Sequence, residues 1–372
     1  CCFARSDRRL GVDFYAHMRI VAVFRCRGRM TRSIAIFGAS GYAGGEIVRL
    51  VDDHPDLEVS YLVAHSKAGS TLSSVHPHLT GGGRKLGPND PAMAGDVDLA
   101  FLALPHGASA EPAMALLERG VKVADLGSDF RLDSVARYEA AYGVPHPFPE
   151  QLGHWPYGLP ELFARDIVSA DKVSVPGCYP TSALLALAPL FAAGIVATDR
   201  VIVDAVSGVS GAGRGAKESL MYGAVDEGVA AYGVLTHRHR PEMEQGLGAM
   251  GNGEPTLIFT PHLVPMQRGI LSTCYASLQP DVDVQQVQDA LDAAYAESPF
   301  VTVVDGPPNT RWVVGTNRAL LSPHVDKRTG SVIVVAAIDN LLKGAAGQAV
   351  QCANLMLGLD ESAGLPMAGW MP

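Results

Sequence analysis

The sequence predicts an α/β fold with two domains: a Rossmann-type parallel sheet domain and a second α+β domain with a mixed or antiparallel sheet. Three observations predict it. In the first half, apolar runs alternate with helical patterns, which is typical of a parallel sheet with helices on both faces. In the second half, strand patterns follow one another with few helices between them. A chain of 372 residues also exceeds the usual size of one domain.

The first domain is expected to begin with a strand, a glycine turn and a helix. Residues 33–37 form a short apolar run that ends at Gly38. A helical pattern follows, with apolar residues at Ile47, Leu50 and Val51. Further strands are predicted at residues 57–64, 97–105 and 121–127. A helix that stops at Gly120 separates the last two strands.

The second domain is predicted to be rich in strands. Its strand patterns lie at residues 200–208, 256–265, 270–278, 318–325 and 331–339. The last two are expected to form a hairpin. Only one clear amphipathic helix interrupts them, from Val284 to Ala294. A closing helical pattern at 343–359 is expected to return to the first domain. The predicted domains are therefore 30–177 with 343–372, and 178–342.

Composition excludes several classes of protein. A formal net charge of −9 argues against a nucleic-acid or anionic-membrane surface, which would need a basic patch. No apolar run reaches the roughly 18 residues of a membrane-spanning helix. Six scattered cysteines do not suggest a disulfide framework in a chain of this length. We expect a cytoplasmic protein in a reducing compartment.

Residues 1–29 form a separate segment that carries many arginines and lacks a long apolar core. It has features of a transit peptide. We prefer to interpret it as an upstream extension of a cytoplasmic protein, because the chain passes directly from Met30 towards the first strand. This extension is expected to be disordered or loosely attached.

The GASGYAG loop, with glycines at 38, 41 and 44, is a relaxed form of a dinucleotide-binding fingerprint. Small residues let the backbone approach a pyrophosphate, and the start of the next helix offers N–H donors. The alternative is an ordinary tight turn between strand and helix. The second strand ends in Ala64, His65, Ser66 and Lys67, without the acid that NAD-selective sites use. This favours NADP(H), with Ser66 a better candidate than Lys67, over a simple polar loop.

Cys178 stands directly before an apolar stretch with helical character. At a helix N-terminus, backbone N–H groups and the helix dipole favour a thiolate, so a lowered pKa is expected. A small buried cysteine at a domain joint is the alternative. Cys178 and a histidine distant in sequence would form a nucleophile and acid/base pair.

His237 and His239 alternate with Arg238 and Arg240. Such a cluster is typical of a solvated turn, of a metal site, or of a proton donor whose neighbouring arginines bind an anion. A metal site would need further ligands nearby, which the sequence lacks, so no metal is predicted. Arg131 follows a predicted strand in a loop, and its planar guanidinium can form two parallel hydrogen bonds to a phosphate. A salt bridge from Arg131 to Asp129 or Asp133 is an equal alternative.

Eight motifs stand in one order across residues 38–351: GASGYAG, LALPHG, DLGSDFRL, YGLPE, VPGCYPT, SGVSGAGR, THRHRPE and AIDNLLKGAAGQAVQ. In these the chain resembles the N-acetyl-γ-glutamyl-phosphate reductase family, relatives of the aspartate-semialdehyde dehydrogenases. VPGCYPT together with THRHRPE is the specific part of the resemblance. The family offers no counterpart for the segment before Met30.

The resemblance implies roles for individual residues. Cys178 would be the nucleophile and His237 the proton donor, with His239 its close neighbour. The cofactor site would comprise Gly38, Ser40, Gly41, Tyr42, Gly44, Ser66, Pro105, His106, Gly107 and Asn340. The substrate and its phosphate would meet Arg131, Ser128 and His239.

The implied activity is NADPH-dependent reduction of N-acetyl-γ-glutamyl phosphate to the semialdehyde, through a cysteine thioester, in arginine biosynthesis. Aminoadipyl and aspartyl phosphates remain alternative substrates. A cysteine hydrolase or acyltransferase and a non-catalytic NADP sensor are alternatives of other classes. By analogy, a homo-oligomer, either a dimer or a tetramer, is expected.

Overall fold

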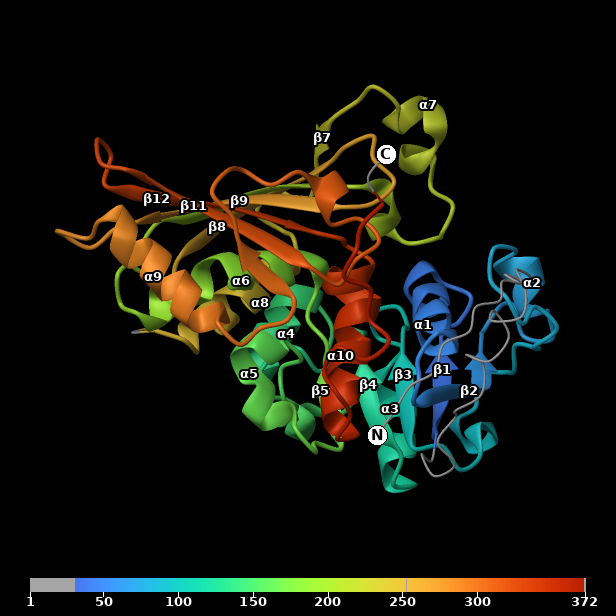
Figure 1. Cartoon of the computed structure of the whole chain (residues 1–372). Helices are drawn as coiled ribbons and strands as arrows, with labels where there is room; N and C mark the ends of the chain where they lie inside the picture. The colour runs from blue at the N-terminus through green and yellow to red at the C-terminus, as the bar shows by residue number, and fades with distance from the viewer. Residues whose placement is uncertain (1–30, 252, 371–372) are drawn as a thin grey trace, which may run out of the picture.

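The computed structural model describes residues 31–251 and 253–370, which form two sheets with helices packed around them (Figure 1). The predicted fold class is confirmed: one sheet is parallel and the other is mixed. The expectations for residues 1–29 lie outside the described residues.

The first sheet has five parallel strands in the order β2-β1-β3-β4-β5. They are β1 (Arg32–Phe37), β2 (Leu57–Val63), β3 (Leu99–Leu102), β4 (Lys122–Asp125) and β5 (Lys172–Ser174). The accompanying helices are α1 (Tyr42–Asp52), α2 (Leu72–Val75), α3 (Ala110–Glu118), α4 (Val135–Tyr142) and α5 (Pro160–Ile167). Four strands confirm predicted runs. The pattern does not predict β5, because three residues are too few to show a period.

Both faces of this sheet are covered, which explains why β1 is apolar throughout. Ile34 and Ile36 enter one buried cluster, whereas Ala35 and Phe37 enter another on the opposite face. Strands buried on both faces lose the usual alternation of apolar and polar residues. The carboxyl ends of these strands form the edge at which ligands collect in open α/β sheets.

The second sheet has seven strands in the order β10-β11-β12-β9-β6-β8-β7. They are β6 (Val201–Ser207), β7 (Ala230–Ala231), β8 (Leu257–Leu263), β9 (Ile270–Ser277), β10 (Val301–Val303), β11 (Ala319–Asp326) and β12 (Ser331–Ile338). The predicted hairpin between β11 and β12 is confirmed. Alternate residues of β9 are buried, because helices cover one face of this sheet.

The helices of this half are α6 (Cys178–Ala192), α7 (Tyr222–Val225), α8 (His239–Gly248) and α9 (Val284–Tyr295). The one amphipathic helix expected between the strands is confirmed as α9, and the structure adds α7 and α8, which the sequence pattern does not show. The sequence of α8 carries two glycines and many polar residues, so it shows no apolar stripe. Met243 and Leu247 nevertheless pack into the core beside α6. Short 3₁₀ turns lie at Pro91–Ala94, Pro149–Gln151, Val209–Ala212, Glu218–Leu220 and Thr310–Trp312.

The closing helical pattern is divided into two pieces. A π-helix spans Leu342–Ala346, and α10 (Gly347–Met356) follows and ends earlier than expected. Helix α10 packs against α1, α5 and β4 of the first sheet (Figure 1). The chain thus returns to the first domain after completing the second sheet, while the exact domain boundaries stay a prediction.

Candidate active site

The glycine loop brings the backbone of two segments into close contact. Gly38 has φ +82°, and a Cβ there would overlap the carbonyl oxygen of Ala103. A Cβ on Gly44 would overlap the carbonyl oxygen of Gly38. Among the described residues no side chain caps α1, which begins after Gly41. The first N–H groups of α1 therefore suit the phosphates of a dinucleotide.

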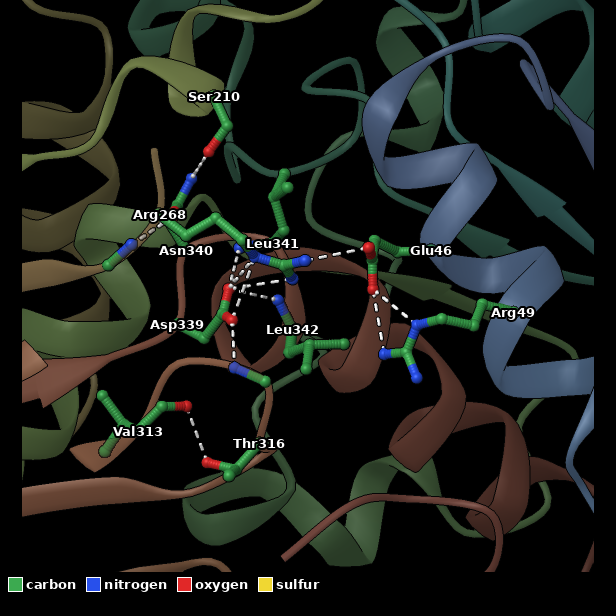
Figure 2. A network of polar contacts seen from close by, with 12 residues as sticks. Glu46, Arg49, Ser210, Arg268, Val313, Thr316, Asp339, Asn340, Leu341 and Leu342 are labelled. Carbon is green, nitrogen blue, oxygen red and sulfur yellow. Dashed lines mark hydrogen bonds and ion pairs between the residues drawn. The ribbon is translucent and has the colours of Figure 1, made fainter. Parts of the chain in front are cut away.

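Seven of the ten predicted cofactor residues line one groove of about 490 Å³: Gly38, Ser40, Gly41, Tyr42, Ser66, Pro105 and Asn340. Asn340 is held from both sides, since its Oδ1 accepts from the Gly269 amide at 2.7 Å and its amide donates to Ser210 Oγ at 3.0 Å (Figure 2). Lys67 is not part of the lining, so Ser66 is the better placed of the two.

The other three residues have different positions. Gly44 packs against Gly38 beneath the loop. The Gly107 amide donates to Asp129 Oδ1 at 2.8 Å. His106 lines a second cavity instead of the groove. The resemblance had grouped Gly44 with the cofactor loop and His106 and Gly107 with a second wall of the cofactor site, but none of the three lines this groove.

The second cavity, of about 670 Å³, contains Cys178, Arg131, Ser128, His237 and His239 in its lining. It adjoins the dinucleotide groove. Six residues line both hollows: Leu104, Leu126, Arg131, Cys178, Gly211 and His239. The predicted nucleophile therefore lies where the two spaces meet.

Tertiary contacts fix Cys178 at the first turn of α6. Gly177 is the N-cap residue, and its amide donates to Glu242 Oε1 at 2.9 Å. On the other side, Gly344 of the π-helix lies so close that a Cβ there would be 2.8 Å from the Cβ of Cys178. Cys178 thus sits between α6, α8 and the π-helix.

The expected lowering of the Cys178 pKa was wrong for this geometry. Burial raises the pKa of the thiol to about 11, although Arg131 and backbone N–H groups at the start of α6 act in the opposite direction. Removing solvent disfavours the thiolate more than these groups stabilise it. The sulfur is therefore a thiol at neutral pH.

The two histidines have different surroundings. His237 Nδ1 accepts from the His239 amide at 3.2 Å, and His237 lines only the second cavity. The Nε2 of His239 lies against Gly177, directly before Cys178. Its buried Nδ1 has no hydrogen-bond partner in the described part of the chain. Burial lowers the pKa of His237 to about 4 and that of His239 well below its usual value. Both rings are therefore neutral at pH 7.

Arg131 lines both hollows and is held by contacts to all three of its guanidinium nitrogens. Its Nε donates to the carbonyl of Val175 at 2.9 Å and its Nη2 to that of Leu126 at 2.7 Å. Its Nη1 lies 3.6 Å from Glu242 Oε2. The alternative salt bridges to Asp129 and Asp133 are not formed. Asp129 instead accepts backbone N–H groups at the start of α3, and Asp133 pairs with Arg137.

Glu242 is the residue that sequence reasoning missed. Its Oε1 accepts from both Tyr157 Oη at 2.7 Å and the Gly177 amide, while its Oε2 faces Arg131. The side chain is 1% exposed. It follows His239 by one helical turn, so THRHRPE places an imidazole and a buried carboxylate on one face of α8. In the sequence alone, Glu242 is an ordinary acid in the first turn of a helix.

Further wall residues come from the first domain. His106 Nδ1 is 2.8 Å from Ser128 Oγ, and its ring stacks on Tyr142 with centroids 4.0 Å apart. The guanidinium of Arg238 lies 5.5 Å from the centre of the Tyr142 ring. Arg131, Arg238 and Lys217 bring positive charge to the cavity, whereas no Asp or Glu stands among its described lining residues. The cavity suits a ligand with several negative charges and no ammonium group.

The chain matches known protein families over most of its length. Residues 33–170 match the family model described as semialdehyde dehydrogenase, NAD binding domain, and residues 178–340 match semialdehyde dehydrogenase, dimerisation domain. An N-acetyl-γ-glutamyl-phosphate reductase of Arthrobacter sp. is 47% identical over 92% of this chain and 100% of its own. The chain belongs to the N-acetyl-γ-glutamyl-phosphate reductase family. A reductase of the same name from Dehalococcoides mccartyi is 46% identical over 91% of this chain and 98% of its own.

Solved structures support the fold of this reductase family member. Aspartate semialdehyde dehydrogenase II of Vibrio cholerae, complexed with ASA, superposes with a TM-score of 0.66 at 20% identity, covering 88% of this chain and 99% of that one. The Candida albicans aspartate semialdehyde dehydrogenase with NADP gives 0.67 at 15% identity, covering 88% and 98%. At these identities the likeness concerns the fold alone.

No helix within residues 31–251 and 253–370 is long and apolar enough to cross a membrane. In the same residues, no three His, Cys, Asp or Glu side chains are grouped in a way that could hold a metal ion.

The raised pKa predicts how Cys178 reacts with iodoacetamide. A thiol is unreactive below its pKa, so the alkylation rate should rise about tenfold per pH unit between pH 7 and 10. The midpoint should lie near 11. Mass spectrometry of the peptide that contains Cys178 measures the rate, with Cys178→Ser as the control for other thiols. A rate that is already at its plateau at pH 7 would contradict the burial argument.

Glu242→Gln should lower the midpoint of that alkylation profile. Glu242 raises the pKa of Cys178 through its negative charge, and glutamine keeps the shape without the charge. Loss of the buried ion pair with Arg131 should also lower the free energy of unfolding by about 3 kcal/mol, which urea denaturation measures. Glu244→Gln, on the same helix, is the matched control. An unchanged midpoint in Glu242→Gln would show that Glu242 does not act on the thiol.

Proposed function

We propose that this protein reduces N-acetyl-γ-glutamyl phosphate to N-acetylglutamate semialdehyde with NADPH, releasing phosphate, as a step of arginine biosynthesis. One observation carries the proposal: Cys178, Arg131 and His239 line both the dinucleotide groove and the cationic cavity. A single sulfur can then meet a carbonyl that also faces the cofactor. The names of the relatives support the identity of the substrate.

In the first step, the Cys178 sulfur attacks the acyl carbon. A C–S bond forms, the bond from carbon to the phosphate oxygen breaks, and phosphate leaves. Because the thiol is protonated, its proton must move to a base as the bond forms. Arg131, which lines both hollows, would attract the phosphate through its charge, and amides at the start of α6 would stabilise the developing oxyanion.

In the second step, the thioester carbon is reduced. The bound dinucleotide supplies a hydride to this carbon. The C–S bond then breaks to release the aldehyde, and the sulfur regains a proton from the imidazolium formed in the first step. A thiolate whose conjugate acid has a high pKa is a poor leaving group. Protonation of the sulfur as the C–S bond breaks therefore speeds release of the aldehyde.

His239 is the better candidate for that proton carrier. It lies against Gly177 and faces both hollows, and its Nδ1 is free of partners among the described residues. His237, to which the resemblance gave the role, engages the backbone of His239 through Nδ1. We propose that His239 exchanges protons with Cys178 and that His237 holds the loop in place.

Charge separates this substrate from an alternative. Aspartyl phosphate carries a free ammonium, and the cavity offers no carboxylate in its described lining to pair with it. An N-acylated substrate has no such charge. A cysteine hydrolase would not need the groove lined by the glycine loop, and a non-catalytic dinucleotide sensor would not need a thiol in that groove. Both alternatives therefore leave part of the site unexplained. An aminoadipyl chain differs by one methylene and is distinguished only by assay.

Three further features complete the proposal. NADPH is favoured over NADH because the groove ends at His65 and Ser66 without an acid.

A dimer or tetramer is supported by the description of the second family model and by the sheet face opposite α6, where Ile333 and Val335 are only half-buried. A cytoplasmic location fits the need for a reduced thiol.

Cys178→Ser should abolish turnover while NADPH binding persists, because serine keeps the shape of α6 but lacks the sulfur nucleophile. Turnover is measured as phosphate-requiring reduction of NADP by N-acetylglutamate semialdehyde, with aspartate and aminoadipate semialdehydes as comparisons. Quenching of NADPH fluorescence measures binding. Equal turnover of aspartate semialdehyde by the wild-type protein would contradict the substrate assignment, and loss of NADPH binding in the variant would give Cys178 a structural role.

Ser66→Asp should weaken NADPH binding about tenfold relative to NADH, because the new carboxylate repels a 2′-phosphate and accepts from a ribose hydroxyl. Ser66→Ala, which removes the hydroxyl without adding charge, is the control. The ratio of the two dissociation constants is the measurement. A ratio unchanged by the aspartate would place the 2′-phosphate elsewhere.

A further inference from the structure

A chain of ion pairs crosses from the second domain to the cofactor helix. Arg268, in the turn between β8 and β9, donates through Nη1 to Glu46 Oε1 at 2.9 Å. Its Nε and Nη2 donate to Asp339 Oδ1 at 3.3 and 3.2 Å. Glu46 lies on α1, one turn after Tyr42 of the groove. Figure 2 shows Arg268 placed between the two carboxylates. One guanidinium therefore joins α1 to the end of β12.

Asp339 fixes the backbone conformation of the segment from Asn340 to Gly344, which forms one wall of the groove. Its Oδ1 accepts from the amides of Leu341 and Leu342 at 2.8 and 3.2 Å, and its Oδ2 accepts from that of Gly315 at 2.8 Å (Figure 2). These bonds fix the turn into the π-helix. Asn340, Leu341 and Gly344 of this segment line the groove, and Gly344 lies against Cys178.

The pairs are well shielded from water. The side chains of Arg268, Glu46 and Asp339 are 16%, 13% and 0% exposed. Burial opposes ionisation of Glu46, yet Arg268 and Arg49 hold the pKa of its carboxyl below the usual value. Ion pairs with so little solvent are screened weakly and have a defined geometry.

We propose that Arg268 is a positioning residue for hydride transfer. By binding Glu46 and Asp339 at once, it sets the position of the wall from Asn340 to Gly344, and with it Cys178, relative to the cofactor helix. The inference rests on the proposed function. A hydride donor and acceptor must approach within a few tenths of an ångström of the productive distance, so a small displacement of this wall slows the transfer.

Glu46→Gln is the sharpest test, because it removes the charge that crosses the domains and leaves the pair of Arg268 with Asp339. We expect kcat to fall about 10- to 100-fold and the primary isotope effect with deuterated NADPH to rise. The KM for the acyl phosphate should change little, as should alkylation of Cys178 without cofactor. Arg268→Lys should act in the same direction, since one ammonium cannot bridge both carboxylates as the fork does.

Arg49→Gln is the matched control. Arg49 also pairs with Glu46, at 2.9 Å, but within α1, so kcat should stay within about twofold of wild type. A second readout needs no turnover: bound NADPH should protect Cys178 from iodoacetamide in wild type and Arg49→Gln, and protect it less in Glu46→Gln. A wild-type kcat, isotope effect and protection in Glu46→Gln would overturn the inference, as would equal losses in Arg49→Gln. A wild-type protein that reduces no acyl phosphate would overturn the proposed function alone, because the protection test would still decide the role of Arg268.

Discussion

Charged groups must be buried where the two sheets meet, and this constraint shapes the whole site. Glu242 holds Arg131 and the first turn of α6. Asp339 and Glu46 share Arg268. Lys343 lies 2.6 Å from Glu161, and both side chains are at most 1% exposed. Each buried charge is costly unless its partners are in place, so these pairs favour one arrangement of the segments around Cys178 over nearby alternatives.

The same burial determines the chemistry of the sulfur. A helix N-terminus and an arginine both favour a thiolate, yet desolvation outweighs them and keeps the thiol protonated. The same burial lowers the pKa of His237 and His239, so both rings are neutral at pH 7.

Local patterns predicted much of the fold because they report on short-range constraints. The glycines at 38 and 44 predict a tight strand-to-helix turn, and both positions admit no side chain. The alternation in β9 and the hairpin of β11 and β12 follow from their apolar spacing. Helix α8 escaped prediction, and the helical pattern at 343–359 did not show that its first turn is a π-helix. Helix α8 is held by contacts with α6 and its polar anchor, and the π-helix by Asp339, so neither leaves an apolar period in the sequence.

The sequence by itself determined the residue types of the site. These are a cysteine at the start of a helix, a glycine loop after β1, a polar segment without an acid after β2, and a histidine pair beside arginines. Only the tertiary structure decided where these residues lie and what surrounds them. It placed His239 instead of His237 against Gly177, moved His106 from the groove to the cavity, paired Arg131 with Glu242, and reversed the direction of the thiol pKa. The reason is physical: proximity and desolvation depend on segments that are distant in the chain, and no local pattern contains them.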